Sequence, residues 1–209
     1  MLSAFGINTA GSTRKYSYKY DMKRYTHWLF ILALLGCSGA HAAGNNWIDA
    51  MSFSYGEDLD DNDTTLYRFG LQNKWQRTWL NGGAWYVGGY WDAELSYMES
   101  DHKNSENDEL FAVGLTPVFR FQRDASLSSG VSPYAEVGIG PHLISETRLG
   151  RQKYSSALQL GSVLGFGLGF GDKGQYEISY RLQHISNADI KTPNQGMNLH
   201  LLRLGYSFD

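Results

Sequence analysis

One segment decides the fold: residues 176–186, which read Tyr-Glu-Ile-Ser-Tyr-Arg-Leu-Gln-His-Ile-Ser. As far as Leu182, apolar or aromatic residues alternate with polar or charged ones. Because successive side chains of a β-strand point to opposite faces, this alternation predicts a strand with one apolar and one polar face. His184 and Ser186 continue the apolar face. A base and a nucleophile on an apolar face are unusual for an enzyme of aqueous substrates, and they favour an enzyme whose substrate is a lipid.

The same alternation recurs in seven further segments, which are separated by stretches rich in turn-forming residues. The predicted strands, in chain order, cover residues 50–55, 67–72, 85–97, 111–122, 134–139, 158–170, 176–186 and 198–208. In each strand the bulky apolar residues share one face. The opposite face mixes glycines with charges of both signs: Arg68, Asp92, Glu94, Arg120, Glu136, Glu177, Arg181 and Arg203.

Two architectures use eight amphipathic strands. A soluble barrel turns its bulky apolar face inward. A bacterial outer-membrane barrel turns that face toward lipid, encloses a polar interior and carries aromatic residues near the strand ends. The glycine-rich charged face is suited to a narrow interior, so the sequence predicts an all-β fold: an eight-stranded antiparallel up-and-down transmembrane β-barrel.

The topology follows from the even number of strands. Barrels of this kind keep both termini in the periplasm, with short turns there and longer loops outside. The expected outer loops are 57–64, 99–109, 146–156 and 188–196, and the expected inner turns are 76–83, 123–132 and 171–174. The seventh strand then ends near the outer leaflet, and the hairpin to the last strand brings Asn198 within reach of His184.

The first 42 residues are typical of a secretory signal peptide. Basic residues between positions 14 and 24 precede the apolar run 28–35, and Ala40-His41-Ala42 fits a cleavage site. The apolar run is shorter than the roughly 20 residues that a membrane-spanning helix needs. Met22 is an alternative start, and Cys37, after Leu34-Leu35-Gly36, is an alternative lipidated cleavage site. We therefore expect a leader at 1–42 and a barrel at 43–209.

Charge and composition limit the partners. Loss of the leader removes five basic residues and one acidic residue, which changes the formal net charge from −3 to −7 (−3 − 5 + 1). An acidic chain without a basic helix is a poor candidate for nucleic-acid binding. The acidic segment 57–63 lacks the glycine and terminal glutamate of a calcium-binding EF-hand loop, so we interpret it as a solvated loop. No cofactor or metal site is predicted, and the sequence leaves open whether the barrel forms a homodimer.

The run from His184 to Gly196, His-Ile-Ser-Asn-Ala-Asp-Ile-Lys-Thr-Pro-Asn-Gln-Gly, resembles the signature of the lipid A 3-O-deacylase (PagL-like) family. Segments 89–93, 136–140 and 147–150 are also similar to that family. The resemblance implies a barrel in the cell outer membrane that hydrolyses the ester-linked hydroxyacyl chain at position 3 of lipid A, the lipid part of lipopolysaccharide. It implies Ser186 as the nucleophile, His184 as the base and Asn194 as an oxyanion donor.

The chain departs from the family at one position. The third triad member in the family is a glutamate on the last strand, where this chain has Asn198. An amide can orient the imidazole but adds no charge, and replacing a triad acid by its amide can cost about 10⁴ in rate. Asp189 in the adjoining loop is an alternative partner for His184. Two functions therefore remain: a lipid A esterase, or a weakly active or inactive barrel with a structural or adhesive role.

Overall fold

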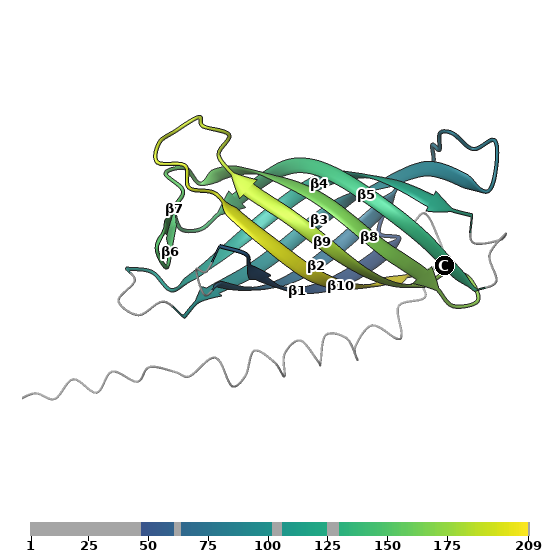
Figure 1. Cartoon of the computed structure of the whole chain (residues 1–209), viewed down its shortest axis with the longest axis horizontal. Helices are drawn as coiled ribbons and strands as arrows, with labels where there is room; N and C mark the ends of the chain where they lie inside the picture. The colour runs from purple at the N-terminus through teal and green to yellow at the C-terminus, as the bar shows by residue number, and fades with distance from the viewer. Residues whose placement is uncertain (1–46, 61–63, 102–105, 125–129, 209) are drawn as a thin grey trace, which may run out of the picture. The chain divides into compact units, whose positions relative to one another are not determined.

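The computed structural model describes residues 47–60, 64–101, 106–124 and 130–208. Within these residues, eight long strands close into one barrel, and a short hairpin lies between β5 and β8 (Figure 1). The barrel strands are β1 (Ala50–Asp58), β2 (Thr64–Lys74), β3 (Trp85–Ser100), β4 (Glu109–Arg123), β5 (Val131–Ile144), β8 (Leu158–Phe170), β9 (Tyr176–Ser186) and β10 (Met197–Ser207). The hairpin is β6 (Arg148–Leu149) with β7 (Gln152–Lys153).

Each barrel strand pairs antiparallel with its neighbour in the chain, and β1 pairs with β10 to close the sheet. The expected eight-stranded up-and-down barrel is confirmed. In the described part of the chain, none of the residues forms a helix long and apolar enough to cross a membrane. The expected leader, residues 1–42, lies outside the described residues.

The barrel has two different ends. At the terminal end, β1 begins and β10 ends, and segments 75–84, 124–130 and 171–175 connect the strands. At the loop end, the connections are 59–63, 101–108, 145–157 and 187–196. All of them lie within a few residues of the predicted turns and loops. By the rule for bacterial barrels, the loop end is the one that faces outside.

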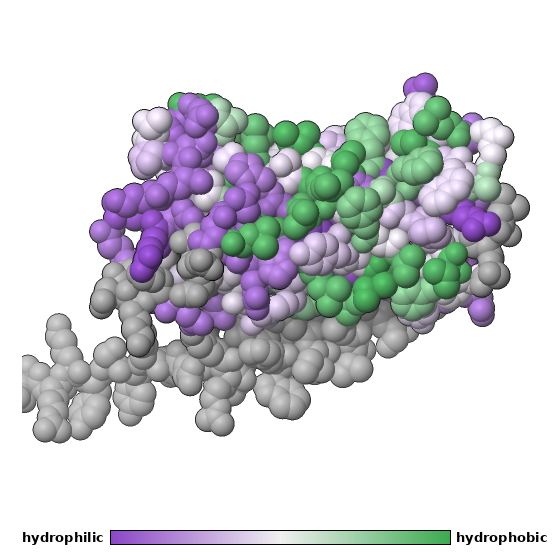
Figure 2. All heavy atoms as spheres, in the orientation of Figure 1, coloured by the Kyte–Doolittle hydropathy of each residue, from purple (hydrophilic) through white to green (hydrophobic). Residues whose placement is uncertain are grey.

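The barrel wall presents its bulky apolar side chains outward, as predicted. Val113, Ile139 and Phe166 are each more than half exposed, whereas Arg181 is 2% exposed. Figure 2 shows apolar side chains along the visible wall and hydrophilic ones gathered at the loop end. Because a protein in water does the opposite, this distribution is the one that a surrounding bilayer stabilises.

Charged residues fill the barrel interior as a hydrogen-bonded network. Glu136 accepts hydrogen bonds from Arg181 Nε at 2.7 Å and from Arg120 Nη2 at 2.9 Å. Glu177 accepts from Arg120 Nη1 at 2.5 Å and from Arg203 Nη1 at 2.8 Å. Each of these two carboxylates is thus matched by two guanidinium groups, and such pairing is the condition under which buried charge is tolerated.

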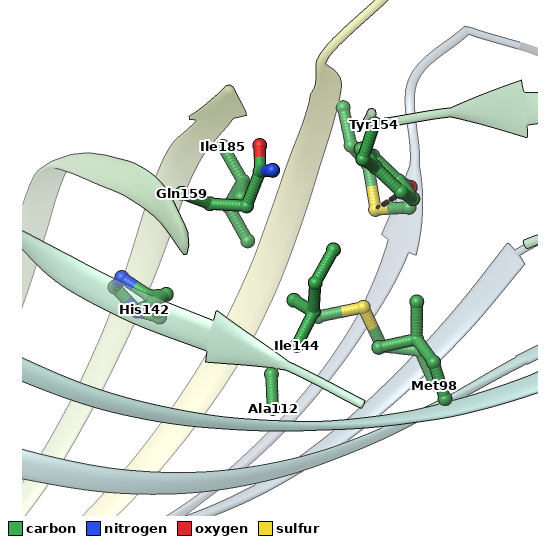
Figure 3. A pocket seen from close by; sticks show the side chains of 9 residues that line it. Met98, Ala112, His142, Ile144, Tyr154, Gln159 and Ile185 are labelled. Carbon is green, nitrogen blue, oxygen red and sulfur yellow. Dashed lines mark hydrogen bonds between the residues drawn. The ribbon is translucent and has the colours of Figure 1, made fainter. Parts of the chain in front are cut away.

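Beneath the loops, the interior changes from charged to apolar. The buried residues of this apolar plug are Leu66, Met98, Leu110, Ala112, Ile144, Leu149, Tyr154, Ile185, Met197, Leu199 and Leu201. The sequence patterns do not reveal the plug, because they identify the inner face only as the less bulky one. A small cavity lies inside it, bordered at one side by His142 and Gln159 (Figure 3).

We predict that Arg181→Met destabilises the folded barrel by about 3–5 kcal/mol, because buried Asp92 loses its guanidinium partner and buried Glu136 keeps only Arg120. Urea unfolding in detergent, followed by tryptophan fluorescence, measures the change. Arg123→Met is the matched control, since Arg123 is an exposed strand-end arginine, and its effect should stay within about 0.5 kcal/mol. Equal unfolding midpoints for the two variants would show that the interior network contributes nothing to stability.

Candidate active site

Three polar side chains of the β9–β10 hairpin lie on the outer wall at the loop end. His184 and Asn198 are directly opposite each other in the ladder, and His184 Nδ1 lies 2.8 Å from Asn198 Oδ1. Ser186 is two residues beyond His184 and shares its face. The residues between and beside them, Ile185 and Met197, are 3% and 1% exposed and anchor the two strands in the apolar plug. The pairing of His184 with Asn198 is the one that strand parity predicts.

Gly196 holds the space between the histidine and the serine. Its φ is +68°, a left-handed conformation that glycine adopts without strain. A Cβ atom at this position would lie 3.0 Å from His184 Cε1 and 3.5 Å from Ser186 Cβ. His184 and Ser186 therefore border the same small space, and glycine leaves that space free.

Asp60 fixes the orientation of the Asn198 amide. Asn198 Nδ2 donates a hydrogen bond to Asp60 Oδ2 at 2.7 Å. A carboxylate oxygen can only accept, so the amide nitrogen must face Asp60 and the amide oxygen must face His184. His184 Nδ1 then carries the hydrogen and donates it to Asn198. Nε2 is left with a free lone pair, which is the tautomer that a general base for a serine hydroxyl requires.

The contribution of Asp60 is absent from the sequence-based prediction. The interpretation of segment 57–63 as a solvated loop was incomplete, because Asp60 is exposed and also bonded to the site. Leu59 extends the ladder by donating its backbone N–H to the carbonyl oxygen of Asn198 at 2.8 Å. The sequence offers one signal for the contact between Asp60 and Asn198, which is the position of Asp60. It follows the first strand, and that strand closes the barrel by pairing with the last strand.

The side chains of Asn194 and Asp189 are hydrogen-bonded to each other in the β9–β10 loop. Asn194 Nδ2 donates to Asp189 Oδ1 at 3.0 Å, and Asn194 Oδ1 accepts from the backbone N–H of Asn187 at 3.0 Å. The alternative of Asp189 as the partner of His184 is therefore not the arrangement observed, since His184 Nδ1 bonds Asn198. Asn194 stabilises the turn immediately after Ser186.

Buried Asn187 ties this loop to its neighbour, a role that the sequence did not suggest. Its Nδ2 donates to the carbonyl oxygens of Tyr154 at 2.9 Å and Lys191 at 2.7 Å. Tyr154 is 2% exposed, and burial raises the pKa of its hydroxyl, which stays protonated and donates to Met197 Sδ at 4.0 Å. The loop that follows Ser186 is thus fastened to the loop before β8.

The site opens onto the apolar wall rather than into the barrel. The neighbouring wall residues Tyr180, Leu182 and Leu202 are 47%, 40% and 50% exposed. The cavity of Figure 3 lies on the inner side of the same strands, where Ile185 and Met197 point. A substrate of His184 and Ser186 must therefore approach along the outer surface.

Comparison with known proteins supplies the family. The sequence model of the family "Lipid A 3-O-deacylase (PagL)" matches residues 65–207. The chain belongs to the lipid A 3-O-deacylase (PagL) family. It is 33% identical to lipid A deacylase PagL of Pseudomonas aeruginosa over 136 residues. This aligned region covers 65% of this chain and 74% of that protein. It is 30% identical over 152 residues to lipid A deacylase PagL of Bordetella bronchiseptica, with 67% and 80% covered.

A solved structure agrees with the fold. The crystal structure of the outer membrane enzyme PagL is similar with a TM-score of 0.65 and 28% identity, over 75% of this chain and 98% of that chain. The protein is thus an outer-membrane β-barrel of the PagL family, and the expected fold, family and location are confirmed. The family match begins at residue 65, so Asp60 lies before it.

We predict that Gly196→Ala lowers the rate of lipid A deacylation about 10²-fold, because the added methyl group displaces the His184 imidazole and φ becomes strained. The rate is measured with the purified barrel and lipid A in detergent micelles. Gly82→Ala is the control, since a Cβ there meets nothing within 4 Å, and it should keep the parent rate. A Gly196→Ala barrel of undiminished rate would mean that the space beside the imidazole is not needed.

Proposed function

We propose that this PagL-family barrel is a serine esterase that removes the ester-linked hydroxyacyl chain at position 3 of lipid A, and so remodels lipopolysaccharide in the outer membrane. The observation that supports the proposal is the hydrogen bond between His184 and Asn198, next to Ser186, on the outward face of the wall at the loop end. A purely structural barrel has no use for a polarised imidazole facing lipid, where unpaired polar groups are costly.

The proposed reaction has two steps. In the first, Ser186 Oγ attacks the ester carbonyl carbon while its proton passes to His184 Nε2. The bond between that carbon and the sugar 3-oxygen then breaks, and the imidazolium returns the proton to the leaving oxygen. In the second step, a water molecule gives a proton to His184 and attacks the carbonyl carbon of the acyl-serine. The bond between that carbon and Ser186 Oγ then breaks, and the imidazolium returns the proton to Oγ. The products are the free hydroxy fatty acid and regenerated Ser186.

Asn194 is the proposed oxyanion donor. Its Nδ2 group carries two hydrogens, of which one is donated to Asp189. The second hydrogen remains for the developing oxyanion. The backbone N–H of Asn187, which follows the nucleophile, is already donated to Asn194 Oδ1. Asn194 is therefore the better candidate of the two donors.

The location of the site suits a substrate held in a membrane. Acyl chains of lipid A would lie along the exposed wall residues Leu182 and Leu202, and its sugar would lie above them at the level of the loops. The proposed partners are thus lipopolysaccharide and the surrounding outer-membrane lipid. We also propose that residues 1–42 direct the chain to export and are removed, which the mass of the purified mature protein tests.

We predict that Ser186→Ala and His184→Ala each lower deacylation at least about 10³-fold, because the covalent route needs both groups. Mass spectrometry of lipid A from cells that express each variant detects the loss, and heat-dependent gel mobility verifies folding. The control is Ser162→Ala: Ser162 lies directly opposite His184 on β8 and should be dispensable.

Two results would contradict this proposal. Activity that survives in Ser186→Ala and disappears in Ser162→Ala would transfer the nucleophile to β8. Intact lipid A in cells that express the parent protein, together with an inactive purified barrel, would favour the structural or adhesive alternative.

A further inference from the structure

We propose that Asp60 is a positioning residue of the active site, which acts on His184 through Asn198. The inference rests on the proposed serine esterase function and adds a fourth member to its machinery. The triad position on β10 lacks a carboxylate. Asp60 supplies one from the segment that follows β1, the strand that pairs with β10 to close the barrel.

Two neighbouring contacts hold Asp60 against Asn198. The carboxylate oxygen Oδ2 accepts from Asn198 Nδ2 at 2.7 Å, and the backbone N–H of Leu59 donates to the Asn198 carbonyl oxygen at 2.8 Å. The backbone N–H of Asp60 in turn donates to Asp58 Oδ1 at 3.0 Å. The segment that follows β1 thus binds both the side-chain Nδ2 and the backbone carbonyl oxygen of Asn198. The remaining polar atom of the amide, Oδ1, accepts the hydrogen bond from His184.

An asparagine in a triad has an orientation problem that a glutamate lacks. A carboxylate presents an acceptor to the imidazole whichever way it turns, whereas an amide presents an acceptor in one orientation and a donor in the other. If the Asn198 amide turned over, its NH₂ would face Nδ1. The imidazole hydrogen would then move to Nε2, and His184 could no longer accept the proton of Ser186.

Asp60 removes this ambiguity because its carboxylate accepts hydrogen bonds only. It also places a negative charge one side chain away from the imidazole, so the amide passes on part of the stabilisation of the imidazolium that forms in the transition state. The family model matches residues 65–207 and therefore does not include Asp60.

The kinetic experiment uses the purified mature barrel with lipid A in detergent micelles. Asp60→Ala should lower kcat about 10- to 100-fold with little change in KM, because substrate contacts are kept and only the base is disturbed. Glu106→Gln is the matched control: it removes one exposed acid from another connection at the loop end, and kcat should not change.

Rescue separates positioning from loop structure. Asn198→Glu in the Asp60→Ala background should recover most of the lost kcat, because a carboxylate then bonds His184 Nδ1 directly. Asn198→Glu with Asp60 in place should have a lower kcat than this double variant, since two carboxylates then face each other. A folded double variant that stays as slow as Asp60→Ala would overturn the proposal, as would a parent-like kcat in Asp60→Ala.

A second readout does not depend on catalysis. Nitrogen-15 NMR of histidine-labelled barrel, with the His184 signals assigned by comparison with His184→Ala, reports the tautomer of the neutral imidazole. The parent should show hydrogen on Nδ1, and Asp60→Ala should show a mixture. The same tautomer in both proteins would refute the role of Asp60 even in an active esterase. An inactive parent with the expected shift in tautomer would instead refute the esterase function and leave the positioning role supported.

Discussion

The hydrogen-bonded seam between β1 and β10 is the constraint on which the rest of the structure depends. In a bilayer, an open sheet edge would leave backbone groups without partners, so a sheet must close on itself. Closure here runs from Ala50 opposite Ser207 to Asp58 opposite Leu199. That register places the outward residues of β1 beside outward residues of β10, such as Phe53 opposite Leu204. It also delivers the residues that follow β1 to the upper end of β10, where Asn198 lies.

The surrounding lipid is the reason why much of this could be predicted from the sequence. A wall with lipid outside and packed charge inside enforces strict alternation, so parity alone assigned Arg181 to the interior and His184 to the exterior. The pairing of His184 with Asn198 was predictable for a related reason. Both are outward, and their strands are consecutive in the chain and pair as a hairpin, so few registers bring their faces together.

The features that could not be predicted depend on contacts between distant parts of the chain. Asp60 and Asn198 are 138 residues apart, and their contact requires the register of the seam, which no local pattern contains. The apolar plug could not be predicted from the sequence for a different reason. Leu199 and Leu201 share a face with Arg203, and whether such a face is charged or apolar at a given depth depends on what the other strands place there. The role of Gly196 follows from its backbone conformation and its distance from the imidazole, neither of which composition reveals.

The position of the site on an open wall has a consequence for selectivity. Among the described residues, Tyr180, Leu182 and Leu202 beside the site are exposed and form an open wall rather than the floor of a pocket that could measure the length of an acyl chain. What the barrel does fix is the height of Ser186 along its axis, since the apolar band of the wall sets how deep the barrel sits in the bilayer. In the proposed reaction, the headgroup of the lipid substrate would hold that substrate at a fixed depth of its own. An ester would then be attacked only where its depth in the membrane coincides with that of Ser186.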